Sequence, residues 1–116
     1  MSIITDEDRK IVRDYIIHNL TMRSLQSERK EAEKSNVKIK RVYLSAYQYQ
    51  ESKALKRLKE LRQEMSQRGI RIVGEHMVGQ DIIEFRYLCR RVPSHVCLQK
   101  KDLHNLIEEK QLELLR

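Results

Sequence analysis

Tryptophan is absent from this 116-residue chain, phenylalanine occurs once, and there are only three glycines and one proline. With Phe85 as its only phenylalanine, the chain must build its core mostly from Leu, Ile, Val and Met, with tyrosines at the margins. All the glycines and the proline lie between Gly69 and Pro93. The first 68 residues contain neither breaker and are rich in helix formers, which predicts long helices. The window with the breakers also holds β-branched and aromatic runs, which predicts strands.

Sequence motifs for cofactor and metal chemistry are also missing. The chain has no phosphate-binding glycine loop, no nucleophile elbow and no CxxC spacing. A structural zinc site needs about four converging nitrogen or sulfur ligands. The two cysteines, Cys89 and Cys97, stand eight residues apart, and we interpret both as structural thiols. We therefore expect a non-enzymatic protein with no cofactor and no metal.

Signals for export and for membrane insertion are lacking as well. Residues 1–6 have neither the basic start nor the apolar run of a signal peptide. No window approaches the roughly 18 apolar residues of a membrane span. Few cysteines without a pairing pattern are typical of a reducing compartment. We expect a soluble cytoplasmic protein with no membrane partner.

Two long helices are predicted in residues 1–68. Thr5 is expected to cap the first, with Asp8 closing a capping box. The best break is Ser35-Asn36, and the second helix is expected from about Val37 to Arg68. Gly69 is placed to take the left-handed conformation that ends a helix, with Ile70 then touching Met65. The two helices predict an antiparallel hairpin. The apolar stripe expected along the second helix is Tyr43, Leu44, Tyr47, Ala54, Leu55, Leu58, Leu61 and Met65.

A three-stranded antiparallel meander is predicted next. A Gly79-Gln80 type II′ turn joins two strands within residues 70–89, and it pairs residues whose numbers sum to 159. In that register Phe85 covers the bare Gly74, and His76 faces Ile83. A third strand at about 95–99 is expected after a turn over residues 90–94.

The final helix is expected to begin near Asp102 as N-cap. The fold class predicted is α+β in a single domain, 1–116. It divides into a helical hairpin (1–68), an antiparallel sheet (69–99) and a C-terminal helix (102–115).

Glu75 and Glu84 are the best candidates for acid–base chemistry. The register makes them cross-strand neighbours, and such a pair can raise one carboxyl pKa. The more common interpretation is a solvated pair balanced by the nearby Arg71 and Arg86. We favour the second interpretation.

The positive charge is unevenly distributed. The net charge is +7, and residues 1–68 carry 16 Lys and Arg against 10 Asp and Glu, whereas residues 69–116 carry 8 against 7. Such an excess attracts acidic partners and speeds their encounter. The residues that we name the basic stripe are Lys34, Lys38, Lys40, Arg41, Tyr49, Lys53, Lys56 and Arg57.

Two functional hypotheses follow from these observations. The first is an accessory or regulatory protein that binds a protein partner and self-associates as a homodimer through surplus apolar helix surface. The alternative is a nucleic-acid-binding protein that uses the basic stripe, with cations for phosphates and tyrosine for base stacking. A winged-helix form of this alternative requires Ser52 to cap a shorter helix before the β-hairpin.

Overall fold

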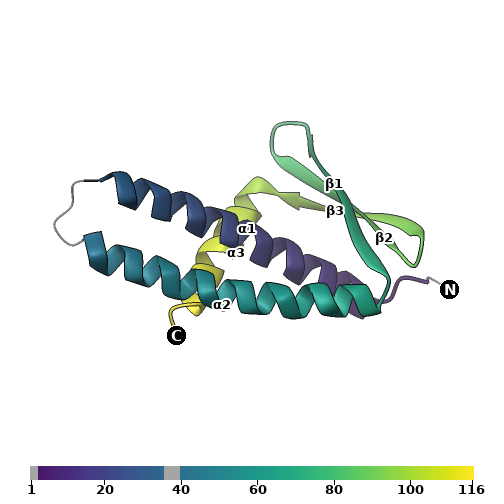
Figure 1. Cartoon of the computed structure of the whole chain (residues 1–116). Helices are drawn as coiled ribbons and strands as arrows, with labels where there is room; N and C mark the ends of the chain where they lie inside the picture. Colours follow the sequence, from purple (N-terminus) through teal and green to yellow (C-terminus); the bar gives the residue numbers. More distant parts are fainter. Residues whose placement is uncertain (1–2, 36–39) are drawn as a thin grey trace.

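The computed structural model describes residues 3–35 and 40–116 and has the predicted α+β fold (Figure 1). A long helical hairpin supports a small antiparallel sheet near one end, and the last helix crosses behind the hairpin. The elements in chain order are α1 (Asp6–Lys34), α2 (Lys40–Gln67), β1 (Ile70–Val78), β2 (Ile82–Cys89), β3 (Val92–Gln99) and α3 (Lys100–Glu113).

The start of α1 confirms the predicted capping box. The backbone N–H of Asp8 donates to Thr5 Oγ1 at 3.1 Å, and the backbone N–H of Thr5 donates to Asp8 Oδ2 at 3.0 Å. Three acidic residues in the first turn stabilise this end of the helix further, because their negative charges interact favourably with the helix dipole. At the other end Ser35 is the C-cap, while Asn36 and the expected helix start at Val37 lie outside the described residues.

The predicted stop of α2 at Gly69 is also confirmed. Gly69 has φ +67°, the left-handed conformation that glycine adopts without strain. Its carbonyl accepts the backbone N–H of Arg90 at 2.8 Å, which ties the helix end to the β2–β3 turn. Met65 and Ile70 lie in one core cluster, as the capping motif predicts.

The predicted register of the β-hairpin is correct only for the pairs from Ile70 to Ile72. Strand order is β1-β2-β3, and Ile72 pairs with Tyr87 as predicted. A bulge between Ile72 and Gly74 then shifts every later pair by one residue. The predictions that Gly74 faces Phe85 and that His76 faces Ile83 are therefore wrong. The extra residue is Val73, and the adjoining glycine, with no Cβ, is typical of such a bulge.

The pairs beyond the bulge define the two faces of the sheet. Glu75 lies opposite Phe85 on the face toward the helices, and His76 lies opposite Glu84 on the outer face. The connection to β2 has three residues, 79–81, instead of the two that the type II′ turn requires. The extra residue in the loop shifts the pairs next to it by one position. The bulge at Val73 restores the predicted pairing from Ile72 back to Ile70.

The β2–β3 connection is shorter than predicted. Arg90 and Arg91 both have positive φ, 50° and 70°, and form a two-residue turn whose twist suits a hairpin. Strand β3 therefore begins at Val92, and the expected five-residue turn is wrong. Pro93 is tolerated there because β3 is an edge strand.

The N-cap of helix α3 lies three residues earlier than predicted. This residue is Gln99, which makes no side-chain cap hydrogen bond. Asp102 is not the N-cap but lies in the first turn, where its negative charge still favours the helix dipole.

The core is divided between the sheet and the hairpin. One buried cluster joins the sheet to the adjoining ends of α1 and α2 and contains Phe85, which is 2% exposed. The second lies where α3 crosses the hairpin and is built from Met22, Leu25, Ala54, Leu58 and Leu114. The predicted stripe of α2 is too wide, because Tyr43 and Leu55 are 46% and 41% exposed.

The molecule is elongated. Its principal extents are 58 × 33 × 20 Å, and its radius of gyration is 16.1 Å, against about 13 Å for a compact domain of this length. The α1–α2 hairpin continues well beyond the sheet (Figure 1). Among the described residues, no helix has the length and apolar character needed to span a bilayer.

Candidate binding surfaces of the helical hairpin

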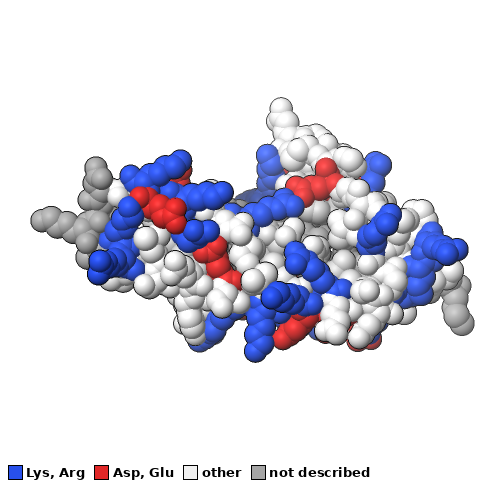
Figure 2. All heavy atoms as spheres, in the orientation of Figure 1, with Lys and Arg blue, Asp and Glu red and all other residues white. Residues whose placement is uncertain are grey.

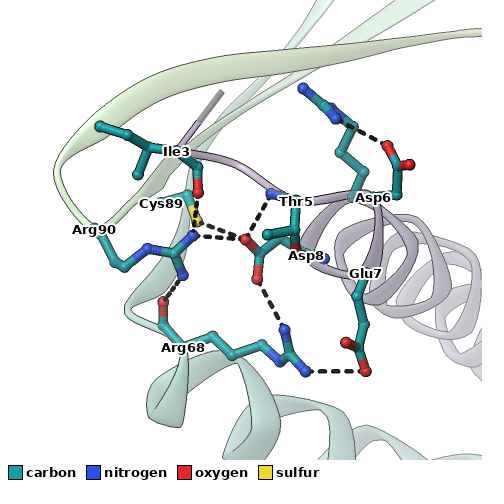
Figure 3. A network of polar contacts seen from close by, with 9 residues as sticks. Ile3, Thr5, Asp6, Glu7, Asp8, Arg68, Cys89 and Arg90 are labelled. Atoms are coloured by element: carbon teal, nitrogen blue, oxygen red, sulfur yellow. Dashed lines mark hydrogen bonds and ion pairs between the residues drawn. The ribbon is translucent and has the colours of Figure 1, made fainter. Parts of the chain in front are cut away.

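The most highly connected polar group is Asp8, whose carboxylate is buried where α1, α2 and the β2–β3 turn meet (Figure 3). Arg90 Nη2 lies 2.7 Å from Asp8 Oδ2, and Arg68 Nη1 lies 3.1 Å from Oδ1. Hydrogen bonding to Arg90 first, then to Thr5 and Arg68, holds the pKa of Asp8 well below its usual value against the opposing effect of burial. This carboxylate joins three elements and acts structurally.

The two cysteines lie on opposite faces of the sheet. Cys89 is buried, and its Sγ donates to Asp8 Oδ2 at 3.6 Å, whereas Cys97 is exposed. Burial, followed by the negative charge of Asp8, raises the pKa of the Cys89 thiol and keeps it protonated and unreactive. Cys89 pairs with Val92, and Cys97 pairs with Glu84, five residues before Cys89 on β2, so the two thiols point to opposite faces.

The described members of the basic stripe are distributed over two helices, α1 and α2. Lys34 lies in the last turn of α1, Lys40 and Arg41 begin α2, and Lys38 lies outside the described residues. In Figure 2 the Lys and Arg side chains are spread over the visible face, with acidic side chains between them at the hairpin end. On this visible face (Figure 2) an acidic partner would meet cations with acidic side chains between them.

Part of the stripe does form a compact group, in which Tyr49 and Lys56 are exposed and Lys53 is half-buried. Tyr49, Lys53 and Lys56 are spaced by four and three residues, so they share one face of α2. Lys53 Nζ lies 4.6 Å from the centre of the Tyr49 ring, a cation–π contact, and also donates to the carbonyl of Arg116. Arg57 points aside and pairs with Glu60 at 3.2 Å.

A second candidate surface is apolar and lies where α3 ends against the hairpin. We name it the hairpin patch: Tyr43, Tyr47, Leu112 and Leu115. Leu112 and Leu115 are 63% and 50% exposed. Tyr47 and both leucines line a cavity of about 330 Å³, near the lower limit of ligand-sized pockets.

Polar groups surround the hairpin patch. Glu28 and Glu108 line the same cavity, as do Gln50 and Gln111. Gln50 is buried, and its Nε2 donates to the carbonyl of Gln111 at 2.8 Å, which fixes the end of α3 on α2. Burial, and then the charge of Glu28, raises the pKa of Tyr47. The sequence indicates this patch only through three leucines near the C-terminus that cannot share one helix face.

The candidate acid–base pair does not exist as predicted. Because of the bulge, Glu75 and Glu84 lie on opposite faces of the sheet. Glu75 pairs with Arg23 of α1 at 3.2 Å. Glu84 Oε1 accepts a hydrogen bond from Arg86 Nε at 2.6 Å, which lowers the pKa of Glu84. For Glu84, the interpretation that a nearby arginine balances its charge is therefore closer to the structure than an acid–base role.

The helix that the winged-helix alternative requires is also absent from the described chain. Ser52 lies inside α2, which runs unbroken for 28 residues. It therefore caps no shorter helix before the β-hairpin.

Fold and surface together define a small basic α+β domain with an extended helical hairpin and an exposed apolar patch at one end of α3. The chain belongs to the YhjD protein family, whose model matches residues 3–116. No curated protein and no solved structure matches it.

Proposed function

We propose that this protein is a non-enzymatic cytoplasmic accessory or regulatory protein that acts by binding another protein through its helical hairpin, and that it self-associates as a homodimer. The observation that carries the proposal is the exposed hairpin patch. Tyr47 and the two leucines come from different elements and line one cavity, and Tyr43, one helical turn before Tyr47, is 46% exposed. Contiguous apolar surface rimmed by polar groups is typical of protein-binding sites.

The shape of the molecule supports self-association. The hairpin extends beyond the sheet, and α3 is the one further element among the described residues that packs on it there (Figure 1). Two hairpins packed face to face would give a helical bundle and cover both patches through one twofold axis. The exposed Tyr43 and Leu115 would then gain the burial that the single chain does not give them.

The test is the mass of the protein in solution. We expect sedimentation equilibrium to give a dimer for the parent, and the double substitution L112S/L115S to weaken dimerisation at least about tenfold, because two apolar side chains are lost from the interface. The matched control is V73S/M77S, which removes two similarly exposed apolar side chains from the sheet. A parent that stays monomeric contradicts the homodimer, and a control that dissociates equally contradicts an interface at the hairpin patch.

Nucleic-acid binding is the second candidate function, and the Tyr49–Lys53–Lys56 group favours it. A ring and two cations on one exposed face suit a stacked base and neighbouring phosphates. We would measure anisotropy with single-stranded and duplex probes at two salt concentrations, for the parent, K53E/K56E and the control K100E/K101E, which makes the same charge change in α3. Loss of binding in K53E/K56E alone, with a shallower salt dependence, would support this function. No binding by the parent at low salt removes it.

A further inference from the structure

The outer face of the sheet carries a row of chemically active side chains. His76 on β1, Glu84 on β2 and Cys97 on β3 are direct partners across all three strands. His95 lies two residues before Cys97 and therefore on the same face. The bulge at Val73 is what turns His76 outward, because in the unshifted register it would face Ile83 and the helices.

Three of these side chains converge on one point. One imidazole nitrogen of His95, the Sγ of Cys97 and one carboxylate oxygen of Glu84 all lie within 4.8 Å of one another. Bonds of 2.0–2.3 Å in tetrahedral zinc sites place the ligand atoms about 3.3–3.8 Å apart. The three ligand atoms must therefore move closer together when they bind the ion. The set of one nitrogen, one sulfur and one oxygen donor suits a borderline-soft divalent ion.

We propose that Glu84, His95 and Cys97 bind a zinc ion on the outer face of the sheet, and that His76 supplies the fourth ligand. His76 is opposite Glu84 in the β1–β2 register. Its Nε2 lies 3.2 Å from the position that a Cβ on Gly74 would occupy, so the ring rests over the bare glycine. To ligate the ion, the ring must turn from Gly74 toward Glu84.

Arg86 positions the carboxylate of this site. Its Nε donates to Glu84 Oε1 at 2.6 Å, which leaves Oε2 for a metal ion. Carboxylate ligands are commonly held by such an outer hydrogen bond. Cys97 is exposed, so an ion can enter from solvent, and its thiol releases a proton when the thiolate binds.

Folding does not depend on metal binding at this site. Phe85, Tyr87 and Cys89 point to the other face of β2 and into the core. We therefore expect a chelator to leave the helical circular dichroism signal unchanged, in contrast to a structural zinc site, whose removal unfolds small domains. The proposed site departs from the expectation of no metal drawn from the sequence, because its ligands lack the zinc-knuckle spacing on which that expectation depended.

The experiment is calorimetric titration of the reduced protein with Zn²⁺, together with visible and near-ultraviolet spectra after addition of Co²⁺. We expect one ion per chain, a thiolate-to-cobalt charge-transfer band, and intense d–d bands that indicate four-coordination. The substitutions C97S, H95A and E84Q should each weaken zinc binding at least about tenfold, and C97S should abolish the charge-transfer band. H76A should weaken binding and reduce the d–d intensity.

The matched control is H104A, which removes an exposed histidine that pairs with Glu108 on α3. It should bind zinc as the parent does, and circular dichroism should show every variant folded. Absence of saturable zinc binding, a ratio of one ion per two chains, or a cobalt charge-transfer band that persists in C97S overturns the proposal. Unchanged binding and spectra in H76A overturn its assignment as the fourth ligand.

Discussion

Arg90 Nη2 and Asp8 Oδ2 lie 2.7 Å apart although the two residues are 82 positions apart in the chain. The same guanidinium donates to the carbonyl of Arg68 at 2.9 Å and to that of Ile3 at 2.6 Å. One side chain in the β2–β3 turn thus holds the start of α1, the end of α2 and the segment before α1 (Figure 3). The sheet is fastened to the hairpin at this point.

Replacement of Asp8 by asparagine should destabilise the protein. The change keeps the size of the side chain but removes the charge that Arg68 and Arg90 face. We expect a loss of about 2 to 3 kcal/mol in the free energy of unfolding, less than for a fully buried ion pair because both arginines reach solvent. Urea denaturation measures it, with D6N in the same helical turn as control. Equal effects of the two substitutions would contradict this role for Asp8.

Stability should fall in two stages as the pH is lowered. Burial lowers the pKa of His18 below its ordinary value of 6.5, so the unfolded chain binds its proton first and stability declines below pH 6.5. The pKa of Asp8 is lowered from 3.8, so its contribution is present above that pH and is lost below it. Urea midpoints between pH 8 and pH 3 would test both stages. H18Q should flatten the first stage, and an unchanged profile in H18Q contradicts the assignment.

The two arginines of the β2–β3 turn should respond oppositely to glycine. Both have positive φ, which strains a residue with a Cβ by about 1 kcal/mol. R91G should therefore stabilise the protein by up to about 1 kcal/mol. R90G relieves the same strain but loses the hydrogen bonds to Asp8, Arg68 and Ile3, so it should be destabilising. Thermal melts that rank R90G above R91G would contradict the clamp described for Arg90.

Gly69 should tolerate substitution less well than Gly79. Both have positive φ, +67° and +77°, and a β-branched side chain resists that conformation in either place. A Cβ at Gly69 would also lie 3.2 Å from Cγ of Arg90, whereas nothing lies within 4 Å at Gly79. We expect G69V to lower the melting temperature more than G79V. Equal shifts would show that only the backbone strain counts.

Truncation of Phe85 should be strongly destabilising. The ring is 2% exposed and lies in the cluster that joins the sheet to both long helices. Its loss should cost about 3–5 kcal/mol. Val73, on the same sheet but 49% exposed, provides the control V73A. Chemical denaturation distinguishes them, and a parental midpoint for F85A would mean that the ring lies outside the core.

Much of the fold could be predicted because its signals are local. The capping box of Thr5 and Asp8, the left-handed glycine at Gly69 and the breaker-free first 68 residues each act within a few residues. They fixed the number, type and order of the elements. The burial of Phe85 followed in the same way, from the alternation of apolar residues along one strand.

The sequence by itself determined the α+β class, the hairpin and the order of the strands. Only the tertiary structure decided the bulge at Val73, the partners of Asp8 and the two candidate sites. A one-residue bulge changes the face of every residue after it, and glycine at position 74 permits this shift without requiring it. The cluster of His95 and Cys97 with Glu84, and the meeting of Tyr47 with the end of α3, depend on distances between remote segments. Such distances follow from packing, which local spacing does not encode.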